Sequence, residues 1–378
     1  MNPRLAAFDF IAACLSVRDD PDTEQALRAA MGAQGLNWDL VLSIADQQKI
    51  APALWVALRA RKLAERLLPD ARQALFKLHL LNTFKNKAFK DQAVDITRRF
   101  NALGVEPMLL KGGASLFTPT FDDPGARVMT DLDVLVPADA AHACWTTLRA
   151  VGYEPIADHP NIVVDYARHH HLRPLYRPRD CGTIEIHRDG LPESAARILP
   201  TRLLWSEAEA VVGPSEIRLK IPSPSHRILH NVLHSDWING THARGVIALR
   251  SLHELAAIQA ARGAAIDWNR IAEMMDRGGH GRLLRASLYL AHRYLGQPMP
   301  ADLKRTVGAW LHYARTRSQL RWSGLDQAVE WLDGFSARNI RERYQCGDDF
   351  GSVARGRLHL AAQLSWKRAK RFRVSGTL

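Results

Sequence analysis

The spacing of hydrophobic positions changes twice along the chain. Over residues 1–104 apolar side chains recur with the 3.6-residue period of amphipathic helices. Asn37 is a suitable N-cap, and Gly104 is a suitable C-terminal cap, because glycine readily adopts the left-handed conformation that ends many helices. The pattern therefore predicts an N-terminal helical region with helices near residues 5–15, 38–44 and 69–103.

From Val105 the pattern changes to short apolar runs separated by turns and by two short helical stretches. Helices are expected near residues 114–117 and 138–151. Strands are expected at residues 105–110, 132–136, 162–166, 171–176 and 183–187. This mixture predicts an α+β fold with an α/β core, built on a small mixed β-sheet.

From Pro200 onward the helical period returns, and the chain contains no internal repeat or low-complexity linker. The predicted organisation has three parts: a helical region at 1–104, a sheet-containing core at 105–200 and a helical domain at 201–378. The expected helices of the last part lie near residues 225–233, 246–261, 268–275, 283–294, 303–313 and 353–372.

The composition is that of an ordinary globular protein with an excess of positive charge. Lys and Arg number 51 against 39 Asp and Glu, which gives a formal net charge of +12. This favours an anionic partner, and nucleotide, nucleic acid and acidic membrane surface all fit. Four scattered cysteines without paired spacing favour a reducing, cytoplasmic setting. No apolar run reaches the ~18 residues of a transmembrane helix, so no membrane-spanning segment is expected.

The candidate chemistry lies on two of the predicted strands. Gly112 and Gly113 follow the first strand, and glycines let a backbone approach phosphate oxygens closely. Asp131 and Asp133 leave the same face of the second strand because they are spaced i and i+2, so they can share a divalent cation. Together these features are typical of a site for a metal-bound nucleoside triphosphate.

A third acid, Glu185, lies in the strand at 183–187, where burying an unpaired carboxylate is costly. A metal ion shared with the Asp pair is the simplest compensation, although an ion pair with Arg173 or Arg188 is the alternative. The nearby cations that can face phosphates are Lys111, Arg127 and His187.

Two groups of histidines and a basic run have weaker interpretations. A transition-metal site at His169–His171 is less favoured than a structural role at the sheet edge. His230 and His234 have the spacing of a zinc protease, but Asn231 stands where that motif requires Glu. The basic run at 367–373 suits nucleic acid or membrane, yet a solvated helix end is the commoner reading. Motifs of serine hydrolases, P-loop proteins and Rossmann proteins are missing.

Four motifs resemble the uncharacterised nucleotidyltransferase family of bacteria, within the DNA polymerase β-like nucleotidyltransferase superfamily. They are L-L-K-G-G-A at 109–114, R-V-M-T-D-L-D-V-L-V at 127–136, G-Y at 152–153 and I-E-I-H at 184–187. The resemblance covers roughly residues 35–260. It departs from the family at Arg188, where an aromatic residue is usual. It also departs at Arg250–Glu254, where the family has an Asp in a Trp-x-x-Asp-like helix, so no role is carried over to those residues.

The resemblance implies transfer of NMP from an NTP such as ATP to an acceptor, with pyrophosphate leaving. Mg²⁺ is the expected ion and Mn²⁺ the alternative. The acceptor can be a small molecule, a peptide or a protein; nucleic acid is less favoured. A kinase-like phosphotransferase and a non-catalytic nucleotide-binding or regulatory module stay open as alternatives. The implied metal-binding and catalytic residues are Asp131, Asp133 and Glu185, and the implied nucleotide-binding residues are Lys111, Gly112, Gly113, Arg127 and His187.

Overall fold

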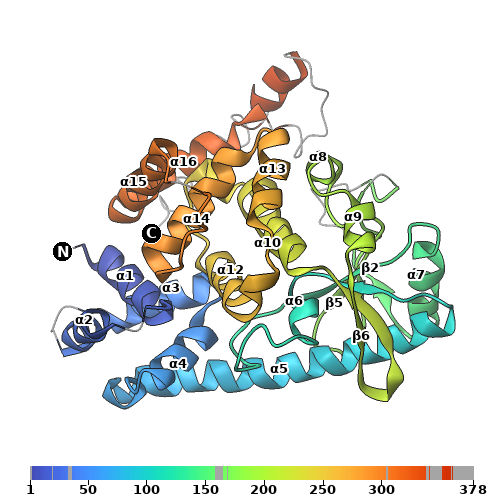
Figure 1. Cartoon of the computed structure of the whole chain (residues 1–378), viewed down its shortest axis with the longest axis horizontal. Helices are drawn as coiled ribbons and strands as arrows, with labels where there is room; N and C mark the ends of the chain where they lie inside the picture. Colours follow the sequence, from blue (N-terminus) through green and yellow to red (C-terminus); the bar gives the residue numbers. More distant parts are fainter. Residues whose placement is uncertain are drawn as a thin grey trace, which may run out of the picture. The chain divides into compact units, whose positions relative to one another are not determined.

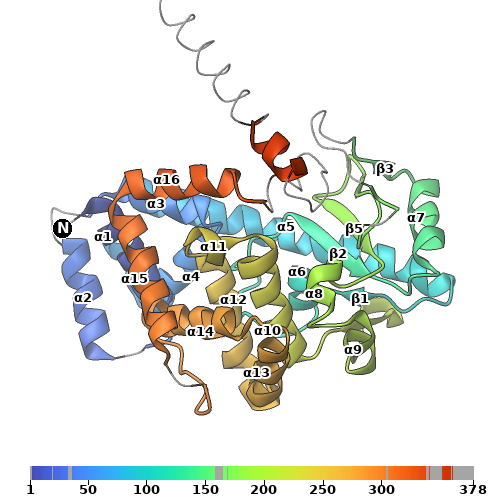
Figure 2. The same cartoon turned by 90° about the horizontal axis from the view of Figure 1, so that it is seen from above.

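The computed structural model describes most of the chain (Figures 1 and 2). The chain divides into two compact units, residues 1–159 with 163–317 and residues 160–162 with 318–378. No helix among the described residues is both long and apolar enough to cross a lipid bilayer. The described residues are 2–18, 20–32, 36–157, 165–167, 169–303, 305–337, 340, 351–358 and 360.

Three N-terminal helices lie where the sequence predicted them, and three further helical elements were not predicted individually. Asn37 caps α3 as expected, since its side-chain oxygen accepts a hydrogen bond from the Leu40 amide at 2.9 Å. Gly104, with φ of +76°, follows the longest helix, α5. The helices are α1 (Pro3–Leu15), α2 (Pro21–Gly32), α3 (Trp38–Gln47), α4 (Ala51–Ala60), the 3₁₀ turn η1 (Ala64–Arg66) and α5 (Pro69–Ala102).

A seven-stranded mixed sheet occupies the first unit, which confirms the α+β fold. Its strand order is β3-β4-β5-β2-β1-β7-β6. The central strands β2 and β5 are parallel, whereas β1 is antiparallel to β2 and parallel to β7. The strands are β1 (Met108–Leu109), β2 (Asp131–Leu135), β3 (Glu154–Pro155), β4 (Leu175–Tyr176), β5 (Thr183–His187), β6 (Glu209–Val212) and β7 (Arg218–Ile221).

The expectation that only helices follow Pro200 is wrong for two strands. β6 and β7 form an antiparallel hairpin, and β7 continues the sheet beside β1. Along β7 buried and more exposed positions alternate, with Leu219 and Ile221 in the core, which is the period of a half-buried strand. The segment is only four residues long, so its alternation is hard to separate from the surrounding helical pattern.

Several expected elements in the middle of the chain are shorter or shifted. The glycine pair lies within a helix, α6 (Lys111–Ser115), and not in a turn before one. The expected strand at 171–176 is reduced to β4, with His171 in an isolated bridge to His187. Most of the expected strand at 162–166 falls outside the described residues, and its described part is not in a strand. Helix α7 (Ala141–Ala150) lies where a helix was expected.

Helices form the rest of the first unit. They are α8 (Glu193–Ala196), α9 (Thr201–Ser206), the 3₁₀ turn η2 (Pro214–Glu216), α10 (Pro224–Val232), the π-helix η3 (Leu233–Ile238), α11 (Thr241–Arg244), α12 (Leu249–Arg262), the 3₁₀ turn η4 (Gly263–Ala265), α13 (Trp268–Arg277), α14 (Gly281–Leu295) and most of α15 (Val307–Arg321). Five of them (α10, α12, α13, α14 and α15) lie near predicted positions, whereas the shorter ones were not predicted.

The second unit contains the end of α15, α16 (Ser323–Gly334) and a helical stretch at 351–358. Ile340, Val353 and Leu360 form a small apolar cluster of its own. The helix expected at 353–372 is therefore described only in its first part, and the basic run at 367–373 lies outside the described residues.

The main core lies on one face of the sheet and leaves the other face for the candidate site. Phe89 and Phe100 of α5 pack with Leu132 and Val134 of β2 and with Ile184 of β5. Figures 1 and 2 show α5 running along the sheet, with α7 near its end. Because side chains alternate along a strand, Asp131, Asp133 and Glu185 point away from this core.

Candidate functional site

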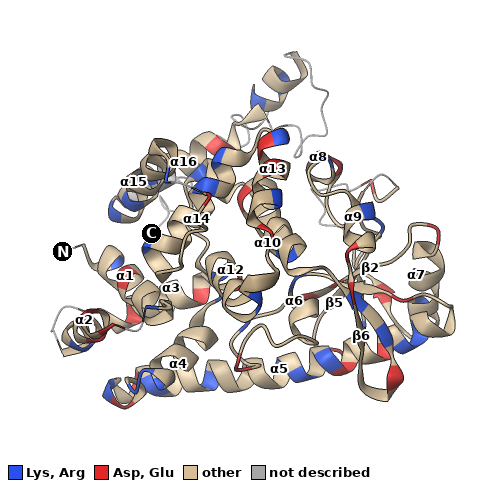
Figure 3. Ribbon diagram, viewed as in Figure 1, with Lys and Arg blue, Asp and Glu red and all other residues tan. Residues whose placement is uncertain are grey.

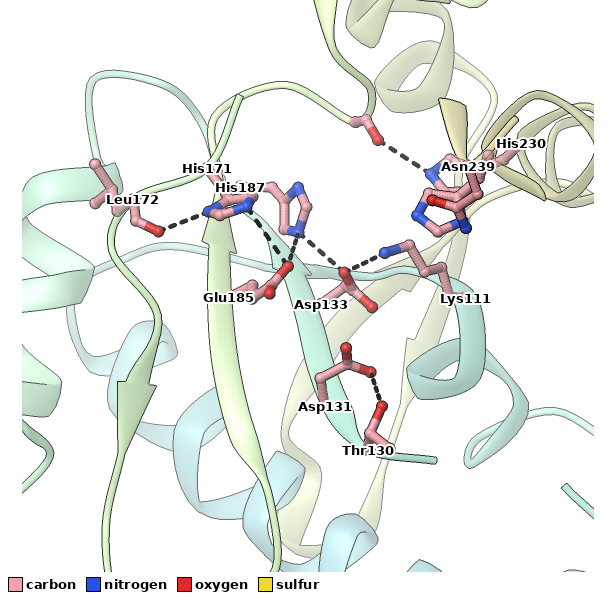
Figure 4. Close-up of polar contacts among 12 residues, drawn as sticks. Lys111, Thr130, Asp131, Asp133, His171, Leu172, Glu185, His187, His230 and Asn239 are labelled. Atoms are coloured by element: carbon pink, nitrogen blue, oxygen red, sulfur yellow. Dashed lines mark hydrogen bonds and ion pairs between the residues drawn. The ribbon is translucent and has the colours of Figure 1, made fainter. Parts of the chain in front are cut away.

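Three carboxylates meet on the free face of the sheet, on neighbouring strands. Asp133 pairs in register with Glu185 across the parallel β2–β5 ladder, and Asp131 lies two residues earlier on β2. Figure 4 shows the three side chains on one side of the strands. The sequence predicted that the two Asp residues share a face, and the β2–β5 register brings Glu185 beside them.

Asp133 is almost fully buried and holds two cationic partners. Its Oδ1 atom lies 2.6 Å from Lys111 Nζ and 3.1 Å from His187 Nε2 (Figure 4). Burial by itself would raise the pKa of Asp133, but Lys111 and His187 outweigh it and hold the pKa well below its usual value. Asp133 is therefore a carboxylate over the whole neutral range.

Asp131 has a different environment on the same strand. Thr130 Oγ1 donates a hydrogen bond to Asp131 Oδ1 at 3.2 Å. Burial, followed by the negative charge of Asp133, raises the pKa of Asp131. Two like charges in one partly buried place repel each other, and a divalent cation between them relieves this repulsion.

His187 lies between the carboxylates of the two strands. Its Nε2 atom is 3.5 Å from Glu185 Oε2 in addition to its contact with Asp133. Burial would lower the pKa of His187, but its contacts with Asp133 and Glu185 prevail and raise it. Asp133, Glu185 and His187 each offer a ligand atom, all within 4.8 Å of one another. These residues form a group that can hold a metal ion.

The alternative ion pairs considered for Glu185 are not its closest contacts. Its Oε2 atom lies 3.8 Å from His171 Nε2 as well as close to His187. Arg188 instead donates to the carbonyls of Tyr166 and His169. Glu185 is therefore surrounded by imidazoles.

The glycines of α6 make room for a buried arginine. A Cβ atom on Gly112 would lie 2.0 Å from Arg127 Nη1 and 2.8 Å from its Cζ atom, so no larger residue fits while Arg127 keeps its place. At Gly113 the closest atom would be Leu109 Cβ at 3.3 Å. Lys111, at the start of α6, has φ of +46°, a left-handed conformation that is uncommon for a side-chain-bearing residue.

Both the side chain and the main-chain carbonyl of Arg127 are held by polar contacts. Its Nη2 atom lies 2.8 Å from Glu254 Oε2 on α12, and both residues are buried. Asn82 and Asn86, on the buried face of α5, donate to the Arg127 carbonyl at 2.9 and 2.8 Å. Burial would raise the pKa of Glu254, but Arg127, followed by other arginines, lowers it. Arg127 thus connects the loop before β2 to α12.

A cavity of about 190 Å³ lies between the start of α6 and the helices α10 and α12. Of its charged lining residues, four are Lys or Arg and one is acidic. Figure 3 shows Lys and Arg positions on α10 and α12 among the many along the chain. The charged lining residues are Lys111, Arg127, Arg227, Arg250 and Glu254, and the polar ones include His230, Asn231, His234 and Asn239.

Two arginines of this cavity have no close carboxylate partner among the described residues. Arg227 donates to Ser115 Oγ at 3.0 Å and Thr120 Oγ1 at 2.8 Å, which are neutral acceptors. Burial lowers the pKa of Arg227 to about 10, and burial followed by Arg127 also lowers that of Arg250. Positive charge therefore exceeds negative charge in the cavity.

The helical residues of the site were missed by the sequence analysis or left without a role. Arg250 and Glu254 are spaced i and i+4 on α12, and Arg227 and Asn231 have the same spacing on α10. This spacing places each pair on one face of its helix. This spacing is the sequence signal that could have indicated these residues, but it does not show which other residues they contact.

Comparison with known proteins identifies a family but no curated relative. None of the curated proteins matches the chain. Residues 34–296, more than half of the chain, match a family described as uncharacterised nucleotidyltransferase. The match includes both walls of the site, from the carboxylates of β2 and β5 to the arginines of α10 and α12. The chain is a member of this uncharacterised nucleotidyltransferase family.

Proposed function

We propose that the protein is a metal-dependent nucleotidyltransferase that moves NMP from an NTP to an acceptor and releases pyrophosphate. Family membership supports nucleotidyltransferase activity in general. The observation that most supports the finer proposal is the position of Lys111 between the carboxylates and the arginines of the site. This residue contacts Asp133 on the sheet and also lines the arginine-rich cavity.

The donor set fits a divalent metal ion. Asp131, Asp133 and Glu185 supply carboxylate oxygens, which Mg²⁺ and Mn²⁺ prefer, and a bound cation would offset the burial and the charge of Asp133 that together raise the pKa of Asp131. Bound there, the ion would neutralise phosphate charge and orient the reacting oxygens. His187 would fix the orientation of Asp133 and Glu185 through its contacts with both.

The cationic cavity fits the phosphates of the nucleotide. Arg250 and Arg227 would face the phosphate oxygens, and Lys111 would move between Asp133 and the phosphates. The role of Gly112 and Gly113 in bringing the backbone close to phosphate stays a prediction, because the Arg127 guanidinium fills the space beside Gly112. In the transfer, an acceptor oxygen forms a bond to the α-phosphorus. The bond from that phosphorus to the bridging oxygen breaks, and pyrophosphate leaves with the bonding electron pair.

The acceptor class stays open between a small molecule, a peptide and a protein. A substrate screen can address it: the full-length protein is incubated with each labelled NTP, Mg²⁺ and a cell extract, and the labelled product is identified. Label from the α-phosphate in the acceptor supports NMP transfer. Label from the γ-phosphate with release of a nucleoside diphosphate would instead support the kinase-like alternative.

The proposal is tested by pyrophosphate release from the Asp131→Asn and Asp133→Asn variants. We expect each to lose activity by about 10³-fold or more, because both remove a metal-binding charge while keeping the side-chain volume. Asp302→Asn, at an exposed position in a turn, is the matched control and should keep full activity. Unchanged turnover in the double Asp131→Asn, Asp133→Asn variant would contradict the proposal.

A further inference from the structure

Three consecutive histidines form a cluster next to the carboxylate site. The ring centroids of His169 and His170 are 4.2 Å apart, those of His169 and His171 are 4.1 Å apart, and those of His170 and His171 are 4.8 Å apart. One ring nitrogen of each lies within 4.8 Å of a ring nitrogen of the others. Successive side chains in a straight strand point to opposite faces, so this convergence requires a bent backbone.

The bend is held by the residues that follow β5. The Arg188 amide donates to the His170 carbonyl at 2.9 Å, and the Asp189 amide donates to the same oxygen at 3.1 Å. Arg188 Nη2 donates to the His169 carbonyl at 2.8 Å. The main chain of the cluster is therefore fixed to the sheet, which reduces the entropy cost of bringing three imidazoles together.

The orientation of the rings differs from that of two stacked histidine pairs elsewhere in the described residues. His230 and His234 stack with an interplanar angle of 11°, and His242 and His312 stack at 13°. In the cluster the angles are 38° to 72°. Stacked rings share their faces, whereas tilted rings can turn their nitrogen-bearing edges toward a common point.

His171 has the hydrogen-bonding pattern of a metal-ligating imidazole. His171 Nδ1 lies 2.8 Å from the Leu172 carbonyl, to which it donates, and this leaves Nε2 as the acceptor nitrogen (Figure 4). A histidine that ligates a metal commonly donates its other ring N–H to a carbonyl in this way.

We propose that His169, His170 and His171 form a site for a nitrogen-preferring divalent cation of the Zn²⁺ class, separate from the carboxylate site. Imidazole suits zinc and its neighbours, whereas Mg²⁺ prefers oxygen. Three nitrogens bound to tetrahedral zinc lie about 3.4 Å apart, given Zn–N bonds of about 2.0–2.1 Å. The ring nitrogens lie within 4.8 Å of one another, so binding requires the rings to turn inward, which the broad outer torsion of His allows.

The two metal sites would be neighbours. His171 Nε2 lies 3.8 Å from Glu185 Oε2, and the ring centroids of His170 and His187 are 5.3 Å apart. Three protein ligands leave one coordination position of a tetrahedral ion open, as in catalytic zinc sites. The site itself does not depend on nucleotide transfer, so it can be tested by binding alone.

The test uses the full-length protein stripped of metal with a chelator and titrated with Zn²⁺, or with Co²⁺ as a spectroscopic probe, in excess Mg²⁺. We expect one equivalent of Zn²⁺ to bind and the Co²⁺ form to show the visible absorption of nitrogen coordination. The double variant His169→Gln, His170→Gln should weaken binding at least 100-fold. Asp133→Asn and His242→Ala are matched controls and should bind Zn²⁺ as the natural protein does.

Two results would overturn the proposal. One is the absence of stoichiometric Zn²⁺ binding to the natural protein in excess Mg²⁺. The other is binding that survives the histidine substitutions but is lost in Asp133→Asn, which would assign the ion to the carboxylate site. Circular dichroism of each variant verifies folding, and the Co²⁺ spectrum of the natural protein tests the ligand type without any substitution.

Discussion

The two walls of the candidate site carry opposite excess charge. On the sheet wall, Asp131, Asp133 and Glu185 share one face of β2 and β5, and Asp133 lies directly beside Glu185. On the helical wall, Arg227 and Arg250 line a cavity in which the acidic residue is Glu254. Lys111 belongs to both walls, through its contact with Asp133 and its place in the cavity lining. A metal-bound triphosphate is complementary to this arrangement, because its metal ion is positive and its phosphates are negative.

Burial disfavours the charged form of the groups on both walls, but nearby charges overcome this effect at only some of them. Asp133 keeps its charge because Lys111 and His187 overcome the effect of burial, whereas the pKa of Asp131 is raised. On the helical wall burial lowers the pKa of both Arg227 and Arg250. On each wall, a bound ligand of the opposite sign would therefore favour the charged forms that burial disfavours.

The largest effect on this balance is expected from Glu254→Gln, which removes the carboxylate partner of buried Arg127. We expect the free energy of unfolding to fall by about 3 kcal/mol, because a buried charge is left unpaired. Added pyrophosphate should restore more stability to the variant than to the natural protein. Glu273→Gln, which breaks an exposed pair with Arg277, is the control. It should change stability by less than about 1 kcal/mol in chemical denaturation.

The next effect concerns the affinity of the helical wall for nucleotide. We expect Arg250→Gln to raise the KM for NTP by about 10- to 100-fold, since one charge-assisted contact contributes about 1.5–3 kcal/mol. The change in kcat should be much smaller, and the KM should become less sensitive to salt. Steady-state kinetics at two salt concentrations measures both. Arg282→Gln, at an exposed position of α14, is the control, and an equal effect there would remove the argument for a local cavity.

The smallest expected effect is a pH dependence of stability. Burial, followed by the charge of Lys111, lowers the pKa of His230 to about 4. The unfolded chain has a pKa of about 6.5, so between these values only the unfolded state binds the proton, and stability falls as pH falls. Going from pH 7 to pH 5 should cost about 2 kcal/mol through His230.

His230→Gln should lose that much less stability over the same pH interval, because a Gln amide can still donate to the Gly190 carbonyl that His230 Nε2 contacts at 3.0 Å. Denaturation curves at pH 7 and pH 5 provide the measurement. His142→Gln, at an exposed position of α7, should leave the pH dependence as it is. A pH dependence of stability that is identical in His230→Gln and the natural protein would show that His230 is not kept neutral by the fold.

Much of the sheet wall could be predicted from the sequence, because it depends on residues that are close together in the chain. The spacing of Asp131 and Asp133 fixes their shared face, and a carboxylate in the middle of the strand at 183–187 indicates a special environment. The helical wall was not predicted. Glu254 reaches Arg127 across 127 positions of sequence, and no periodic pattern carries information at that range.

The sequence by itself determined the long helix α5, the α+β class, the family resemblance and the face of β2 that carries the acids. Only the tertiary structure decided that Asp133 stands level with Glu185, that β7 completes the sheet beside β1, and that Arg127 pairs with α12. It also decided that three successive histidines converge. The physical reason is that periodicity reports which side of an element is buried, whereas register, charge pairing and backbone bends depend on residues distant in the chain.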